Sequence, residues 1–183
     1  GRHQERTQNW DPSYVRYALE QSLRRLGTNY VDLYQLHWPD RLLGPDGEPG
    51  FWNPPEDDVV PLAETLEALD CLVRAGKIRH VGLSNDTPWG VMAFQHLAET
   101  KGWPRMVCIQ NAYSLLARQF EDSLAEVAIR ERFGLLAYSP LAAGALSGKY
   151  LGGALPGGAR LTTREGTPYR RPGAEAAILA YQQ

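Results

Sequence analysis

Apolar positions along the chain follow a helical period in some segments and form short continuous runs in others. Between Asp11, which can cap a helix, and Gly27, which can end one, apolar residues recur at every third or fourth position. The members of this stripe are Val15, Leu19, Leu23 and Leu26. A second helix is predicted between Pro61 and Gly76, with a stripe of Leu62, Leu66, Leu69 and Val73.

Later segments continue the alternation of helix and strand signals. Further helices are expected at residues 88–100, 118–132 and 174–183. Short apolar runs that are typical of strands occupy residues 31–37, 78–84, 106–110 and 135–139. Strands separated by helices of this length need crossover connections, which produce a parallel sheet with helices outside it. The pattern therefore predicts an α/β fold.

This pattern fits two architectures, a doubly wound open sheet and a (β/α)₈ barrel. The G-x-G-x-x-G sequence that a dinucleotide-binding open sheet shows after its first strand is absent. The run 144–150 is not a nucleotide-triphosphate loop, because its glycines are one residue too close and Tyr150 stands where Ser or Thr is needed. A complete barrel usually has about 250 residues, so the barrel interpretation requires that these residues be a segment of one.

Composition excludes several classes of function. Lys and Arg number 19 against 21 Asp and Glu, a net charge of −2 that lacks the basic surface of a nucleic-acid-binding protein. No apolar stretch approaches the ~20 residues of a membrane span, and the first residues lack a signal-peptide core. We expect a cytoplasmic protein with an upstream part missing. Cys71 and Cys108 lie far apart in apolar runs, which predicts reduced buried thiols and neither a disulfide nor a metal site.

One ionisable side chain stands where a strand is expected to open into a loop. His37 ends the apolar run that begins at Val31. In parallel α/β proteins the loops after the carboxyl ends of the strands carry the chemistry. His37 alone also fits a histidine packed at a strand end with its nitrogens bonded to backbone. The position makes His37 a candidate catalytic residue without deciding between these interpretations.

Four motifs in order then resemble a known family. They are the run 22–27 leading into 30–39, the run 76–85, the run 110–116 and the run 137–150. Together they resemble the aldo-keto reductases over almost the whole chain. Within the family, the likeness is to the bacterial Tas-type branch, which is related to the beta subunits of voltage-gated potassium channels.

The resemblance implies a partial (β/α)₈ barrel. It places residues 1–183 as a single incomplete domain covering about the fourth to seventh β/α units, without the N-terminal strands and the last strand. Family members use a catalytic tetrad of Asp, Tyr, Lys and His, of which only the histidine has a counterpart here. In the implied reaction, NADPH gives hydride to an aldehyde or ketone, and His37 donates a hydrogen bond to the carbonyl oxygen. These surroundings favour the catalytic interpretation of His37 over the packing one.

The resemblance also implies a set of cofactor contacts. Ser84, Asn85 and Gln110 match positions that hydrogen-bond the nicotinamide carboxamide, although residues 84–88 also fit a helix-capping turn. Tyr138 matches the aromatic residue on which the nicotinamide stacks, although a tyrosine in an apolar strand is often part of a core. The loop that embraces the pyrophosphate is matched by Ser139, Pro140, Leu141 and Ala142.

Two cations and two tryptophans complete the candidates. Lys149 and Arg160 match positions near the adenosine phosphate, where a guanidinium favours NADPH over NADH. An arginine in the glycine-rich stretch 152–173 also fits a solvated surface residue. Trp38 and Trp52, with Phe51, belong to a long loop that can line a pocket for a small carbonyl substrate or pack on the rim.

These features predict an NADPH-dependent aldo-keto reductase that reduces aldehydes or ketones. An alternative is a nicotinamide-binding regulatory or accessory protein with little turnover, as the channel relatives suggest. Those relatives have Asn at the place of His37, so the histidine favours the enzyme. A third expectation concerns the isolated 183-residue chain. It lacks the Asp, Tyr and Lys of the tetrad and leaves strand edges unpaired, so it is expected to be inactive.

Overall fold

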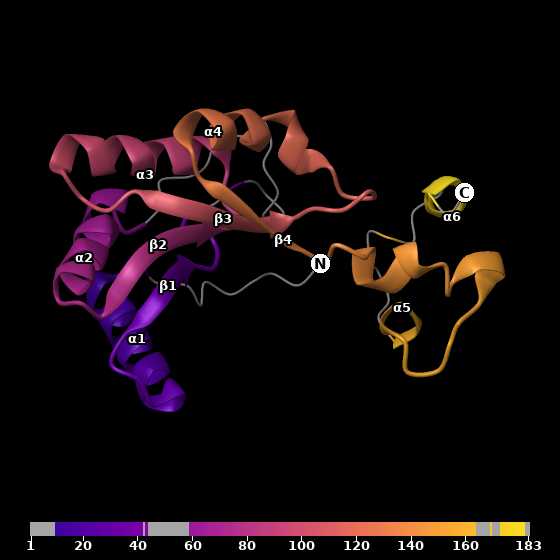
Figure 1. Ribbon diagram of the computed structural model, residues 1–183, viewed down its shortest axis with the longest axis horizontal. Coiled ribbons are helices and arrows are strands. Elements are labelled where there is room, and N and C mark those ends of the chain that lie inside the picture. The colour runs from indigo at the N-terminus through magenta and orange to yellow at the C-terminus, as the bar shows by residue number, and fades with distance from the viewer. Residues whose placement is uncertain (1–9, 42, 44–58, 164–168, 170–172, 182–183) are drawn as a thin grey trace. The chain divides into compact units, whose positions relative to one another are not determined.

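The computed structural model describes residues 10–41, 43, 59–163, 169 and 173–181 (Figure 1). The chain divides into two compact units. The first comprises Gly1–Gln110 and Glu126–Leu136, and the second comprises Asn111–Ala125 and Ala137–Gln183. No helix in the described part of the chain is both long and apolar enough to cross a membrane.

Four strands form one sheet in the order β1-β2-β3-β4 (Figure 1). Their bounds are β1 (Val31–Leu36), β2 (Ile78–Ser84), β3 (Met106–Ala112) and β4 (Gly134–Tyr138). β1 pairs with β2 and β2 with β3, in both cases in parallel. The register places Leu36 beside Leu83 and Ser84 beside Gln110, so the carboxyl ends of the first three strands meet at one edge. The four predicted strands are thereby confirmed within one or two residues at each end.

Helices alternate with these strands as the apolar pattern predicts. They are α1 (Pro12–Leu26), α2 (Leu62–Arg74) and α3 (Pro88–Lys101). Asp11 caps α1 by accepting a 2.8 Å hydrogen bond from the Ser13 amide, and Gly27 ends the helix in the left-handed conformation. The core of the first unit is made of apolar residues from these helices and from the strands, among them Leu19, Leu66, Leu69, Phe94, Val81, Leu83 and Ile109. This core holds the strand ends in fixed register.

Three details differ from the sequence predictions. Leu26 was expected on the buried stripe but is 67% exposed. The buried residues of α1 are spaced four apart, at Val15, Leu19 and Leu23, and Leu26 does not continue this spacing. Cys71 was expected to be buried but lies on the outer face of α2, whereas Cys108 is buried and burial raises the pKa of its thiol. The helix expected at residues 118–132 is a 3₁₀ turn, η1 (Gln119–Asp122), followed by α4 (Leu124–Glu131), because Ser123 has a non-helical backbone.

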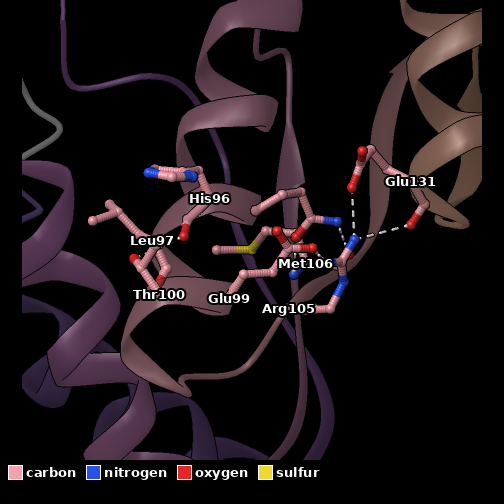
Figure 2. Close-up of polar contacts among 8 residues, drawn as sticks. His96, Leu97, Glu99, Thr100, Arg105, Met106 and Glu131 are labelled. Atoms are coloured by element: carbon pink, nitrogen blue, oxygen red, sulfur yellow. Dashed lines mark hydrogen bonds and ion pairs between the residues drawn. The ribbon is translucent and has the colours of Figure 1, made fainter.

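Figure 2 shows how Arg105 joins two helices to the start of β3. Its guanidinium donates to the Glu131 carboxylate at 2.7 Å and to the Glu131 carbonyl oxygen at 3.3 Å. It also bonds the carboxylate of Glu99 near the end of α3. The contact fixes the ends of α3 and α4 beside the first residue of β3.

The second unit has a smaller core of its own. Ala142 and Ala145 of the 3₁₀ segment η2 (Ala142–Ser147) are buried with Leu161 of α5 (Arg160–Thr163) and Ile178 of α6 (Ala174–Tyr181). A further 3₁₀ turn, η3 (Leu151–Gly153), lies between η2 and α5 in the sequence. The predicted helix from residue 174 is confirmed as far as Tyr181, and residues 182–183 lie outside the described residues.

Candidate functional site

His37 is the first residue after β1, and its side chain is exposed. The imidazole centroid lies 6.1 Å from the ring of Trp38, which is half-buried. The His37 carbonyl oxygen accepts a 2.9 Å hydrogen bond from the Asn85 side-chain amide. The backbone of His37 is therefore fixed while its ring faces solvent, so this histidine does not belong to the core.

Ser84 and Asn85 form the end of β2 and the first residue after it. The Ser84 hydroxyl is buried, donates to the Gln110 carbonyl oxygen at 2.7 Å and accepts from the Asn85 amide group at 3.1 Å. The Asn85 backbone N–H donates to the same carbonyl oxygen at 3.1 Å. Asn85 has a positive φ of 54°, a conformation that asparagine tolerates better than most residues.

These bonds join three strand ends that lie far apart in the sequence. His37 follows β1, Asn85 follows β2, and Gln110 lies near the end of β3. Within the described part of the chain, no group hydrogen-bonds to the side-chain amide of Gln110, which is half-buried. The structure thus gathers four of the predicted site residues, His37, Ser84, Asn85 and Gln110, at one edge of the sheet.

The second unit contains the predicted cofactor residues from Tyr138 onward. The Tyr113 amide donates a 3.2 Å hydrogen bond to the Tyr138 carbonyl oxygen, which joins the segments after β3 and at the end of β4. Ser139 follows with a positive φ of 54°, and Ala142 and Ala143 have φ of 49° and 57°. Leu141 is exposed, whereas Ala142 is buried. Ser139, Pro140, Leu141 and Ala142 thus form a sharply curved loop after β4.

Some backbone amides of this loop already have partners. Ala142 N donates to the Ser139 carbonyl oxygen and Gly144 N to the Leu141 carbonyl oxygen, both at 2.8 Å. A Cβ at Gly144, whose φ is 93°, would lie 2.9 Å from the Lys149 side chain. The absence of a side chain at residue 144 therefore lets Lys149 approach the loop.

Lys149 and Arg160 are both exposed. Lys149 directly precedes Tyr150 in the sequence, and Arg160 directly precedes Leu161. The Leu161 N–H donates a 3.1 Å hydrogen bond to the Tyr150 hydroxyl. This bond brings the two cations to the same part of the second unit. Trp52 and Phe51, which were predicted to line a substrate pocket, lie outside the described residues.

The sequence prediction missed one pair beside these groups. The Arg41 guanidinium forms an ion pair with Asp86 at 2.5 Å, and the Asp86 side chain is almost fully buried. Burial raises the pKa of the Asp86 carboxyl, while the hydrogen bond and the charge of Arg41 act to lower it. The only signal in the sequence is that opposite charges follow two strands expected to be neighbours, Arg41 shortly after His37 and Asp86 directly after Asn85.

Comparison with known proteins identifies the class. Residues 2–174 match the Aldo/keto reductase family, and the chain belongs to that family. The family predicted from the four motifs is thereby confirmed.

Particular relatives agree with this assignment. The chain is 49% identical to Protein tas of Escherichia coli (strain K12) over 172 residues, which is 93% of this chain and 50% of the relative. It is 36% identical to Aflatoxin B1 aldehyde reductase member 2 of Rattus norvegicus, covering 77% of this chain and 35% of that protein. The chain therefore spans about half the length, or less, of the curated relatives it matches.

A solved structure supports the fold class. The glycerol dehydrogenase AKR11B4 from Gluconobacter oxydans is similar with a TM-score of 0.72 and 27% identity, covering 96% of this chain and 46% of that one. The predicted fold class is confirmed: it is the parallel α/β fold of the family's (β/α)₈ barrels, of which the described residues show a four-stranded part.

Proposed function

We propose that the protein is an NADPH-dependent oxidoreductase that reduces small aldehydes or ketones to alcohols. Membership of the aldo/keto reductase family supports oxidoreductase activity in general. The observation that carries the proposal is the hydrogen-bonded group of His37, Ser84, Asn85 and Gln110 at the carboxyl ends of three neighbouring strands. In barrels, this end of the strands is where ligands bind and reactions occur.

The residues of the first unit fit the nicotinamide end of the cofactor. A carboxamide presents one acceptor and two donors, and amide or hydroxyl side chains match it because they can donate and accept. Gln110 is half-buried near the end of β3, and its backbone carbonyl oxygen accepts from the Ser84 hydroxyl. Ser84, Asn85 and Gln110 would hold the carboxamide here.

The second unit fits the phosphate-bearing part of such a cofactor. Its loop has small residues and several positive φ values, which let backbone approach a ligand closely. Lys149 and Arg160 add two exposed cations, and a guanidinium suits a phosphate dianion through its forked donors. We assign these residues to the phosphates and Tyr138 to stacking on the nicotinamide ring.

His37 is proposed as the catalytic residue of this chain. When bound, the cofactor would supply hydride to the carbonyl carbon of the substrate, and negative charge would then develop on the carbonyl oxygen. The exposed imidazole of His37 donates a hydrogen bond to that oxygen, and the hydrogen bond to the His37 carbonyl oxygen fixes the backbone from which the ring projects. Trp38 and Trp52 are proposed to flank the carbonyl substrate.

The remaining proposals concern the chain as a unit. We place it in the cytoplasm as part of a single barrel domain, with a small-molecule substrate and with neither a nucleic-acid nor a membrane partner. We also infer that the isolated 183-residue chain does not turn over substrate. The family's Asp, Tyr and Lys have no counterparts in it, and β1 and β4 are the two edge strands of the described sheet.

The test uses the protein produced from its whole reading frame and, separately, the 183-residue chain. The first is expected to bind NADPH and to oxidise it when a simple aromatic aldehyde is added, and the second is expected not to oxidise it. His37→Asn should lower kcat about a hundredfold, since one donor to the developing oxyanion is lost. His96→Asn, at an exposed position of α3, is the matched control.

Three outcomes decide between the candidates. NADPH binding without oxidation across a range of aldehydes and ketones would favour the regulatory alternative. Absence of NADPH binding would overturn the proposal. Oxidation of NADPH by the 183-residue chain would overturn only the inference about its inactivity.

A further inference from the structure

We propose that Arg41 and Asp86 are positioning residues that hold the segment after β1 against the turn after β2, and so orient His37 and Asn85. Arg41 lies four residues after His37, and Asp86 directly follows Asn85. Their ion pair, with Arg41 Nη2 2.5 Å from Asp86 Oδ1, joins residues that are far apart in the sequence. The role assigned to this pair rests on the proposed function of His37 and Asn85.

Arg41 contacts the first turn of α3 at several points. Its Nη2 also donates to the Thr87 hydroxyl at 2.9 Å, and Thr87 caps α3 by accepting from the Gly90 amide. The guanidinium carbon lies 4.9 Å from the centroid of the Trp89 ring, within the range of a cation–π contact. The Arg41 side chain, from the segment after β1, therefore contacts three residues that follow Asn85: Asp86, Thr87 and Trp89.

The backbone of α3 is adapted to this pair. A Cβ at Gly90 would lie 2.2 Å from Asp86 Oδ1 and 2.4 Å from Arg41 Nη2. No side chain fits in that space while the pair is in place. The glycine is therefore explained by the ion pair, since a helix interior otherwise favours alanine.

The pair is poorly arranged for stability alone. Asp86 has 1% and Arg41 17% of its side chain exposed, so both charges have largely lost their hydration. Among the described residues, Arg41 Nη1 and Asp86 Oδ2 have no hydrogen-bond partner. A buried pair with unsatisfied atoms is often no more stable than an apolar replacement of the same volume. Its value here is the geometry that it imposes.

That geometry acts on the candidate site through a second, parallel connection. The Asn85 side chain donates to the His37 carbonyl oxygen at 2.9 Å, so the same two segments are joined once at His37 and Asn85 and again at Arg41 and Asp86. Two connections fix both the distance and the rotation between the segments, whereas one fixes only the distance. Loss of the ion pair should therefore allow the His37 ring and the Asn85 amide to rotate relative to each other.

The experiment compares three variants of the protein made from its whole reading frame. Arg41→Met leaves Asp86 buried without its partner, Arg41→Lys keeps the charge but lacks the forked donors, and Arg41→Met with Asp86→Leu removes both charges. Arg79→Met is the matched control, since Arg79 forms an exposed ion pair with Asp32 nearer the amino ends of β1 and β2. Thermal stability, NADPH affinity, kcat and hydrogen exchange of residues 36–41 and 84–87 are measured for each.

We expect the double variant to regain most of the thermal stability that Arg41→Met loses. Its NADPH dissociation constant should remain raised about tenfold and its kcat lowered by about ten- to a hundredfold, because the reacting groups are misplaced. Hydrogen exchange of both segments should be faster than in the wild type. Arg41→Lys should retain the wild-type properties only in part, and Arg79→Met should leave all of them unchanged.

Two results would overturn the inference. If the double variant regains NADPH affinity and kcat together with stability, the pair has a structural role only. If hydrogen exchange of residues 36–41 stays at the wild-type rate in the double variant, the pair does not hold this segment. The exchange measurement needs no cofactor, so it judges the positioning role even if the wild type fails to bind NADPH and the proposed function falls.

Discussion

The side chain of Gln95 hydrogen-bonds both backbone polar groups of Met106. Gln95 lies on α3 with 1% of its surface exposed. Its Nε2 donates to the Met106 carbonyl oxygen at 3.2 Å, and its Oε1 accepts from the Met106 N–H at 3.0 Å. Met106 is the first residue of β3, so the buried side-chain amide of Gln95 fixes the position of the start of this strand relative to α3.

Replacement of Gln95 by Leu should therefore destabilise the protein strongly. The change keeps the volume but leaves two buried backbone groups without partners, at a cost of about 1–3 kcal/mol for each. We expect the free energy of unfolding, measured by urea denaturation, to fall by a few kcal/mol. His96→Ala, at the exposed next position of the same helix, should change it little. Equal effects of the two substitutions would contradict this account.

The strands and their helices could be predicted from the sequence because each has a local signal. Asp11 before α1 and Gly27 after it mark the limits of that helix, and the apolar run from Ile78 to Ser84 is the strand β2. The position of Ser84 and Asn85 followed from the end of that strand. Local signals of this kind need no knowledge of the remainder of the chain.

Other features could not be predicted because their causes are not local. The pairing of Arg41 with Asp86 depends on the parallel register of β1 and β2, which no periodicity in the sequence specifies. The break at Ser123 and the left-handed conformations of Ala142 and Ala143 occur in residues without a preference for them, so the surrounding packing must impose them.

Asn85 combines two properties that substitution can separate. Its φ is 54°, and its side chain donates to the His37 carbonyl oxygen and to the Ser84 hydroxyl. Asn85→Ala should lose these side-chain bonds and also strain the backbone, at a total cost of about 2–4 kcal/mol. Asn85→Gly should lose the side-chain bonds without the backbone strain and cost less. Thermal denaturation compares the two, and a glycine variant no more stable than the alanine variant would show that backbone strain is unimportant here.

Gly90 provides a test of packing at the first turn of α3. In a helix interior, alanine is ordinarily more stable than glycine by about 1 kcal/mol. Here a Cβ would collide with Asp86 and Arg41, so Gly90→Ala should destabilise the protein by about 1–3 kcal/mol. Gly134→Ala is the control, because its Cβ would meet only the Val107 carbonyl oxygen at 3.9 Å. Increased stability of Gly90→Ala would mean that the ion pair yields easily.

Glu121 should make the stability of the protein depend on pH. Its carboxylate accepts from the Tyr113 hydroxyl at 2.6 Å and from Arg118 Nη2 at 2.7 Å. The bonds from Arg118, and then that from Tyr113, lower the pKa of Glu121 below its ordinary value of 4.5. A lowered pKa means that the folded state binds the proton less tightly than the unfolded state does. The stabilisation is therefore complete above pH 4.5 and is lost as the pH falls through the folded-state pKa.

Glu121→Gln removes this titration. The wild type should have the higher Tm at neutral pH, and the difference should shrink as the pH is lowered below 4.5, as calorimetry across the acid range can measure. Because the group is exposed, added salt should reduce the difference at neutral pH. Tyr113→Phe, which removes one of the donors and leaves Arg118 in place, should show a smaller change of the same sign. A difference in Tm that stays constant across the acid range would mean that Glu121 has the same pKa in the folded and unfolded states.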